Sequence, residues 1–178
     1  LMSLKLYNSL TKNKEIFKPI VRGKVKIYSC GPTVYNYIHI GNHRTFLMSD
    51  FLKRALKFNK FKVKHIMNIT DSGHLSSDAD TGEDKMVKAA MKEKKSVWDI
   101  ARFYTNAFKN DLKDLNIETP NKFTLATEHM RAQINMIKKL EKRDYTYSAD
   151  GNIYFDNSKY SNKKLGGLNT KSKARVKK

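Results

Sequence analysis

The sequence predicts an α/β fold built on a parallel sheet, and three consecutive segments carry this prediction. Residues 24–30, KVKIYSC, form a short β-rich run with Val25 and Ile27 on one face, and Gly31-Pro32 ends it. Residues 41–58 place apolar side chains at helical spacing, and residues 61–70, FKVKHIMNIT, form a second β-rich run. The order strand, helix, strand fits a right-handed parallel crossover.

The middle segment of this unit predicts a helix with one broad apolar stripe, which we expect to pack against the sheet. The stripe consists of Phe46, Leu47, Phe51, Leu52, Ala55, Leu56 and Phe58. The following strand alternates through Phe61, Val63 and His65 and continues with Ile66 and Ile69, before an Asp-Ser-Gly turn that begins at Asp71.

The rest of the chain predicts mostly helix. We expect two helices over residues 83–94 and 97–115, and a third over 127–143 after Pro120. Four aromatic side chains at helical spacing in the second helix favour a core position over a base-stacking platform: Trp98, Phe103, Tyr104 and Phe108. The third helix has its own predicted core stripe, formed by Met130, Ile134, Ile137 and Leu140.

The segment YTYSADGNIYFD predicts a β-hairpin, with Asp150-Gly151 as the tight turn. Asn, Ser, Gly and Lys dominate the residues after it, which predicts a basic, weakly ordered tail over residues 161–178.

Composition narrows the class of protein. The 178 residues contain 39% hydrophobic residues, enough for one core and a smaller appended one. No run of eighteen apolar residues occurs, and the first residues lack the apolar stretch of a secretory signal, so we expect a cytoplasmic protein that does not contact a membrane. The formal net charge of +19 suits a polyanionic partner such as nucleic acid, although lysine outnumbers arginine as an AT-rich genome alone would produce.

Cys30 is the one cysteine of the chain, which excludes an internal disulfide and suits a reducing compartment. It can be a buried small hydrophobe, a reactive thiol or a metal ligand. Because ligands of parallel sheets bind outside the carboxyl ends of strands, its position at the end of a predicted strand indicates a site.

The segment HIGN, residues 39–42, follows this strand and opens the predicted helix. A helix amino terminus offers free N–H groups to an anion, and Gly41 permits close approach to the backbone, so a phosphate is the expected ligand, with His39 and Asn42 as hydrogen-bond donors. In the alternative, Asn42 only caps the helix and His39 packs under the loop.

These segments together resemble the amino-terminal part of the cysteinyl-tRNA synthetase family. The resemblance rests on LYNSLTKNKEIFKPI, on GKVKIYSCGPTVYNYIHIGNHRT, on KHIMNITD, and on DADTGEDKM and DGNIYFDNSKY. It implies the first half of a class I Rossmann-like nucleotide-binding domain over residues 1–74. A helical connective insertion with the β-hairpin would follow over residues 75–160, and the basic tail or a truncated continuation over 161–178.

The resemblance implies a role for each residue of the site. Cys30 would be a ligand of a zinc ion (Zn2+) that binds the thiolate of the substrate cysteine, and a soft thiolate bonds zinc far better than the hydroxyl of serine. Gly31, Thr33 and Thr70 would line the cysteine pocket.

His39, Gly41 and Asn42 would bind ATP, supplied with Mg2+, and His39 and Asn42 would be the catalytic pair. They would steady the phosphates while the cysteine carboxylate attacks the α-phosphorus to form cysteinyl-adenylate, which then acylates tRNA(Cys). Asn42 replaces the usual final histidine of the motif. His43 is not its substitute, because one residue is about 100° around a helix.

The same resemblance implies that much is missing. The family's other zinc ligands, its lysine-rich ATP-clamping loop and its anticodon-binding domain have no counterpart here, and NTKSKAR in the tail is a chance match. Leu1 before Met2 suggests that the ends are not the natural ones.

We therefore expect an incomplete amino-terminal portion of a cysteine–tRNA ligase that does not aminoacylate alone, for which a carboxy-terminal half supplied as a separate chain is a candidate partner. Two alternatives stay open, a cysteine:amino-sugar ligase of a related family and a non-catalytic RNA-binding remnant.

Overall fold

The structure is a computed structural model that describes residues 4–72 and 85–159. The chain divides into two compact units, and each is described by itself. One unit comprises Pro19–Met130, and the other combines Leu1–Lys18 with Arg131–Lys178. The larger unit includes residues on both sides of the predicted domain boundary after residue 74. The predicted division of the chain into domains stays a prediction. The predicted tail and residues 73–84 lie outside the described residues.

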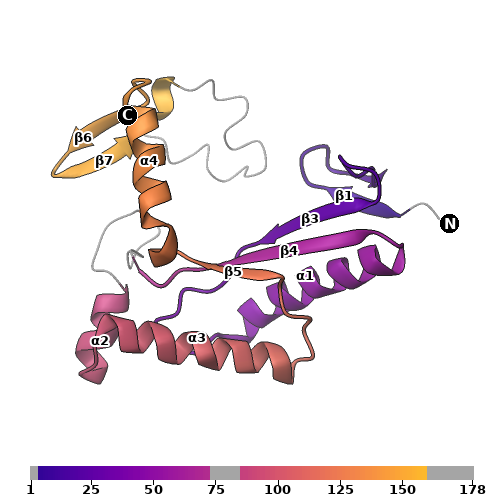
Figure 1. The fold of residues 1–178 in the computed structure, drawn as a ribbon, viewed down its shortest axis with the longest axis horizontal. Coiled ribbons are helices and arrows are strands. Elements are labelled where there is room, and N and C mark those ends of the chain that lie inside the picture. Colours follow the sequence, from indigo (N-terminus) through magenta and orange to yellow (C-terminus); the bar gives the residue numbers. More distant parts are fainter. Residues whose placement is uncertain (1–3, 73–84, 160–178) are drawn as a thin grey trace. The chain divides into compact units, whose positions relative to one another are not determined.

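A three-stranded parallel sheet forms the centre of the larger unit (Figure 1). Strand β3 (Lys24–Ser29) pairs with β4 (Lys62–Ile69), from Lys24 opposite Lys62 to Ser29 opposite Met67. Helix α1 (Ile40–Phe58) connects them. The predicted parallel strand–helix–strand unit is confirmed, with boundaries that differ by one residue.

The third strand, β5 (Lys122–Leu125), was not predicted. It pairs in parallel with the carboxyl half of β4, from Ile66 opposite Lys122 to Ile69 opposite Leu125. Its four residues, KFTL, alternate polar and apolar side chains, but a run of four is too short to predict a strand. The free edge of β4 therefore determines this strand, because a run so short has no stable strand conformation alone.

Two helices precede β5, α2 (Lys85–Glu93) and α3 (Val97–Asp114), and both were predicted. Ser96 caps α3, since its side chain accepts a hydrogen bond of 3.1 Å from the Asp99 N–H. The prediction that four aromatic residues of α3 are core residues is half wrong. Tyr104 and Phe108 are buried, but Trp98 is 61% exposed and Phe103 46%.

Helices α1 and α3 cover the same face of the sheet (Figure 1). The core between the helices and the sheet consists of two clusters. One contains Phe46, Met67, Phe108, Leu112 and Ile117, and the other contains Val34, Ile69, Met86, Ala90, Ile100, Ala101 and Tyr104. The two clusters thus contain apolar side chains from α1, α2 and α3 as well as from the sheet.

The buried face of α1 differs from the predicted stripe. Phe46 and Leu56 are buried as expected, but Phe51 is 57% and Phe58 85% exposed. The buried positions instead include three polar residues, His43, Asp50 and Lys53. The apolar pattern is broad enough to allow several rotations of the helix, and polar partners from the α3–β5 connection select this one.

Those partners form a polar cluster of Asp50, Lys53, Arg54 and Glu118 beneath the sheet. The Asp50 carboxylate accepts hydrogen bonds from the Arg54 Nε, at 2.6 Å, and from the Glu118 backbone N–H, at 3.0 Å. The buried Lys53 ammonium lies 2.9 Å from the Thr119 carbonyl and 3.3 Å from the Glu118 carboxylate. The cluster therefore joins α1 to the connection that leads into β5.

His65 of β4 is buried beside this cluster. Its Nε2 lies 2.7 Å from the Ser29 Oγ, and its Nδ1 has no hydrogen-bond partner among the described residues. Burial lowers the pKa of His65 below its usual value and the Lys53 ammonium lowers it further, while Asp50 opposes these effects. The imidazole is therefore held in its neutral form.

This environment predicts a loss of stability in mild acid. The unfolded chain binds a proton at His65 more readily than the folded chain, so His65 contributes its full stability above about pH 6.5. The contribution declines as the pH falls below that value, by at most about 1.4 kcal/mol per pH unit. Urea unfolding at about pH 7.5 and 5.5 measures the decline, which should be smaller in His65→Gln than in the unchanged protein. An equal decline in both proteins would contradict the assignment to His65.

The second unit contains two hairpins and a helix. The predicted hairpin is confirmed as β6 (Thr146–Ala149) and β7 (Asn152–Phe155), with positive φ at Asp150 and Gly151, as a type I′ turn requires. A second hairpin, which was not predicted, joins β1 (Lys5–Asn8) to β2 (Asn13–Ile16).

The helix predicted over residues 127–143 forms as a short 3-10 turn, Thr127–His129, followed by α4 (Met130–Glu141). Its predicted core stripe is wrong at Met130, Ile134 and Ile137, which are exposed, and Leu140 is half-buried. Among the described residues, none of the helices has both the length and the apolar character that crossing a membrane requires.

Candidate active site

The carboxyl ends of β3 and β4 are joined by backbone hydrogen bonds, and this brings two of the predicted pocket residues together. The Thr70 N–H donates to the Pro32 carbonyl at 2.9 Å, and the Val34 N–H donates to the Thr70 carbonyl at 3.1 Å. Thr33 and Thr70 are therefore neighbours in an isolated parallel bridge. The segment CGPT thus runs beside the end of β4, where ligands of parallel sheets bind.

Asn68 of β4 orders this corner, and sequence reasoning missed it. Its Oδ1 accepts hydrogen bonds from the Gly31 N–H and from the Tyr28 hydroxyl, both at 2.9 Å. Its Nδ2 donates to the Thr70 Oγ1 at 3.3 Å. The available signal was a lone amide in an otherwise apolar stretch, IMNIT, and Asn is disfavoured within strands unless it bonds to something.

Gly31 is needed here because β3 and β4 approach closely. A Cβ atom at this position would lie 1.8 Å from the backbone oxygen of Asn68 and 2.9 Å from the Cγ of Met67. No side chain can occupy that space without moving the backbone. Glycine therefore allows the chain to leave β3 against the end of β4.

Cys30 lies on the open side of this corner. Its side chain is exposed, and its Sγ lies 3.6 Å from the Gly31 carbonyl. Of the three interpretations of this cysteine, burial as a small hydrophobe is wrong. Within the ranges that the structure describes, no group of three or more His, Cys, Asp or Glu side chains could hold a metal ion. One thiolate does not hold zinc by itself, so the described residues do not complete a zinc site.

His39 is the N-cap of α1. Its Nδ1 accepts a hydrogen bond of 3.0 Å from the Gly41 N–H, and its ring is exposed. Because Nδ1 accepts, the hydrogen of the neutral ring sits on Nε2, which is left to donate. A Cβ atom at Gly41 would lie 3.2 Å from the same Nδ1, so glycine leaves room for the ring. The alternative, in which Asn42 caps the helix and His39 packs under the loop, is therefore wrong.

A cleft of about 570 Å³ connects the two motifs. Its lining consists of Pro32, Thr33, Tyr35, Asn36, Tyr37, Ile38, His39 and Asn42. Three predicted site residues, Thr33, His39 and Asn42, thus open onto one cavity at the amino end of α1. The N–H groups of Gly41, Asn42 and His43 already donate to His39, so the cleft offers a phosphate the His39 and Asn42 side chains and the positive end of the helix dipole.

His43 is absent from this lining. It is buried on the opposite side of α1, where its Nε2 lies 3.4 Å from an Asp111 carboxylate oxygen of α3. Its ring also meets Phe46 edge to face, with 6.0 Å between the ring centroids. His43 therefore joins α1 to α3 and is not a substitute for the histidine that Asn42 replaces.

The fold matches that of a solved class I synthetase. The structure of methionyl-tRNA synthetase from Mycobacterium tuberculosis, in complex with methionyl-adenylate, superposes with a TM-score of 0.57 at 14% sequence identity. The match covers 76% of this chain and 29% of that chain. At this level of identity the similarity shows the fold, a Rossmann-like domain of the class I type.

Sequence comparison shows the family. Residues 16–178 match the model of tRNA synthetases class I (C), catalytic domain, and the chain belongs to this family. Curated relatives named cysteine–tRNA ligase include those of Treponema denticola, 54% identical over 89% of this chain, and Zymomonas mobilis, 50% identical over 86%. The relative from Borrelia hermsii is 46% identical over 94%. The chain spans 32%, 30% and 35%, respectively, of the length of these relatives.

Proposed function

We propose that this chain provides the amino-acid-activating corner of a cysteine–tRNA ligase. In this reaction the carboxylate of cysteine attacks the α-phosphorus of ATP, pyrophosphate leaves, and the resulting cysteinyl-adenylate acylates tRNA(Cys). The observation that carries the proposal is the single cleft onto which the CGPT and HIGN segments open, in a chain about half identical to ligases of this name.

The proposed role of His39 and Asn42 is to bind the phosphates of ATP. The exposed Nε2–H of His39 and the amide of Asn42 are both donors on the cleft, at the positive end of the α1 dipole. Donors that are already oriented stabilise negative charge as it moves onto the pyrophosphate, without reorganisation during the reaction. We assign Gly41 to ATP binding because it keeps the backbone open to the phosphates, and Mg2+ would accompany the nucleotide.

The proposed cysteine pocket lies at the ends of β3 and β4. Gly31, Thr33 and Thr70 are neighbours there, held by Asn68, and the Cys30 thiol is exposed next to them. We propose Cys30 as one ligand of a zinc ion that prefers the thiolate of cysteine to the hydroxyl of serine. Because the described residues do not complete a zinc site, we derive no step of the reaction from the metal.

The proposal is tested with the full polypeptide that carries this chain. We expect cysteine-dependent exchange of pyrophosphate into ATP, no exchange with serine, and transfer of cysteine to tRNA. Bound zinc should decrease when Cys30 is replaced by serine. Transfer to an amino sugar but not to tRNA would instead identify the related sugar ligase. RNA binding without any exchange would identify a non-catalytic protein.

Two substitutions of His39 separate its two roles. Asparagine is a good N-cap, so His39→Asn should keep the free energy of unfolding within about 0.5 kcal/mol, whereas His39→Ala should lower it by about 1 kcal/mol. Both remove the Nε2 donor, and both should reduce the exchange rate by about 100-fold or more. Urea unfolding and exchange kinetics measure the two effects. Full exchange activity in His39→Asn would show that His39 only caps α1 and does not bind the phosphates.

A further inference from the structure

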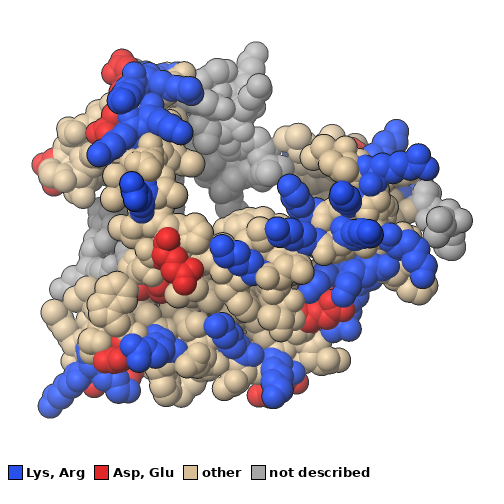
Figure 2. All heavy atoms as spheres, in the orientation of Figure 1, with Lys and Arg blue, Asp and Glu red and all other residues tan. Residues whose placement is uncertain are grey.

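The face of the sheet opposite α1 and α3 carries rows of lysines. Because β3 and β4 are parallel and in register, Lys24 lies opposite Lys62 and Lys26 opposite Lys64. Lys122 of β5 lies opposite Ile66 on the same face. We call Lys24, Lys26, Lys62, Lys64 and Lys122 the lysine face. All five side chains are exposed, and Figure 2 shows basic side chains gathered over this part of the sheet.

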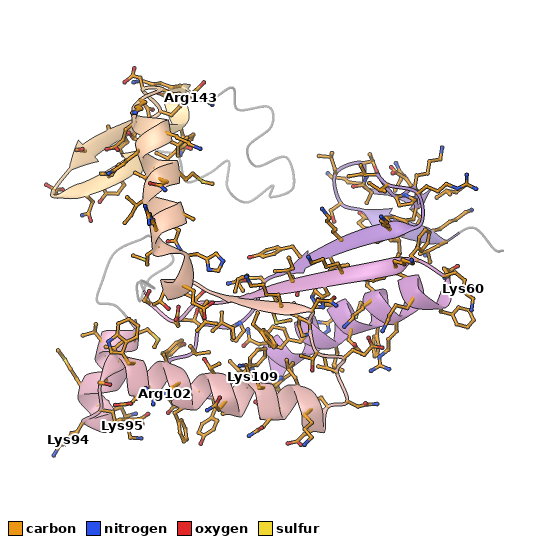
Figure 3. The ribbon with its side chains drawn as sticks, viewed as in Figure 1. Lys60, Lys94, Lys95, Arg102, Lys109 and Arg143 are labelled. Carbon is orange, nitrogen blue, oxygen red and sulfur yellow. The ribbon has the colours of Figure 1, made fainter. Side chains whose placement is uncertain are left out.

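Several cations on α1 and α3 have partners, whereas no lysine of the lysine face has one among the described residues. Arg102 and Lys109 lie on α3 (Figure 3), where Arg102 is 3.8 Å from an Asp99 carboxylate oxygen and Lys109 is 5.5 Å from the Phe123 ring centroid. No lysine of the lysine face forms an ion pair within the described ranges, and β3, β4 and β5 contain no acidic residue.

This arrangement opposes the stability of the fold. Like charges directly opposite each other on adjacent strands repel, and the cost is greatest at low ionic strength. A parallel sheet is also normally covered on both faces by apolar packing. Five unpaired ammonium groups on such a face therefore favour a polyanionic partner, whose charge would remove the repulsion.

The lysine face also leads to the candidate active site. Side chains at alternate positions of β3 lie on one face, so Lys24 and Lys26 are followed by Tyr28 and then by Cys30. At about 3.3 Å per residue, this row spans about 20 Å. Tyr28 is 67% exposed, and its hydroxyl donates to Asn68, the residue that also holds the Gly31 N–H.

We propose that the lysine face binds the phosphate backbone of RNA and guides its end toward the cleft. This inference rests on the proposed function for the identity of the RNA as tRNA. The partner is identified by charge complementarity and by the continuity of the lysine row with Tyr28, Asn68 and Cys30. Lysine contacts to phosphate supply affinity without sequence preference, so this face contributes to the strength of binding and not to the choice of tRNA.

The test uses the full polypeptide and a matched pair of fourfold variants. The first replaces Lys24, Lys26, Lys62 and Lys64 by glutamine. The control replaces four exposed helix lysines by glutamine and so removes the same net charge: Lys88, Lys92, Lys113 and Lys138. Binding of a tRNA(Cys) transcript is measured over a series of salt concentrations, and pyrophosphate exchange is measured without tRNA.

We expect the lysine-face variant to bind the transcript about tenfold or more weakly, with a salt slope smaller by about 2 to 3, while the control changes much less. Arginine at the same four positions should restore binding. Equal losses in both variants, or no loss in either, would overturn the proposal. Exchange should be unchanged, because these lysines lie away from the cleft. If the unchanged protein binds RNA through this face but shows no exchange, the proposed function fails and this inference stands.

The variant is expected to fold, because removing opposed charges should raise its melting temperature at low salt. A melting temperature that does not rise would show that the face is already neutralised by other groups, and would count against an open polyanion site.

Discussion

Replacing Gly31 with alanine should lower the free energy of unfolding by about 3 kcal/mol or more, at the upper end for overpacking of a folded chain. The added Cβ atom would lie 1.8 Å from the backbone oxygen of Asn68, and backbone cannot rotate away as a side chain does. The end of β3 must move, and the hydrogen bond from the Gly31 N–H to Asn68 Oδ1 would be lost with it. Urea unfolding measures the loss.

Gly23→Ala is the matched control for this substitution. Gly23 has φ of +73°, and nothing lies within 4 Å of its added Cβ atom. It should cost only about 1 to 2 kcal/mol, from the left-handed backbone conformation. If Gly31→Ala were as mild as Gly23→Ala, the close approach of β3 to β4 would be wrong. The site would then lack the geometry on which the proposed cysteine pocket depends.

Replacing Asp50 with alanine should lower the free energy of unfolding by about 3 kcal/mol, the low end for removing one partner from a buried charged cluster. The substitution leaves the Glu118 backbone N–H without its acceptor. It also takes away the carboxylate that lies 2.6 Å from the Arg54 Nε, so that Arg54, Lys53 and Lys57 are left with the Glu118 carboxylate, which Lys53 and Lys57 already share. The hydrogen bond from the Lys57 ammonium already holds the pKa of Glu118 below its usual value. Lys53 lowers the same pKa to a smaller extent.

Three further variants test whether Asp50 stabilises the protein as part of a coupled cluster. Asp114→Ala, at the exposed end of α3, should change stability by no more than about 0.5 kcal/mol. Adding Lys53→Met to Asp50→Ala should recover part of the lost stability, because a cluster that has lost one carboxylate then has one positive charge fewer. Strict additivity of Asp50→Ala and Lys53→Met would contradict a coupled cluster. Thermal and urea unfolding of the unchanged protein, the three single variants and the double variant provide the comparison.

Much of the fold was predictable because local signals agreed with it. The β-rich run before Gly31-Pro32, the helical spacing that follows and the second β-rich run together predicted β3, α1 and β4 within one residue. Asp150-Gly151 predicted the β6–β7 hairpin, because few other dipeptides adopt two positive φ angles easily. Strand β5 was missed because its four residues become a strand only beside β4.

The same division holds for the candidate site. The motifs CGPT and HIGN indicated where a ligand binds, and the structure places Thr33, His39 and Asn42 on one cleft. Asn68 was missed, since its three hydrogen bonds join positions 28 and 31 to positions 68 and 70. The roles of these residues in binding cysteine and ATP stay proposals for the experiments above.

The sequence by itself determined the order of elements in the larger unit, the ends of β3 and α1, and the placement of the candidate site between them. These features depend on neighbours in the chain: side-chain periodicity, turn residues and caps act over a few positions. Only the tertiary structure decided which side of α1 is buried, since Asp50 and Lys53 find their partners near Glu118, more than sixty residues away. It also decided that lysines gather in register on one face of the sheet, because strand register depends on how separate segments pair.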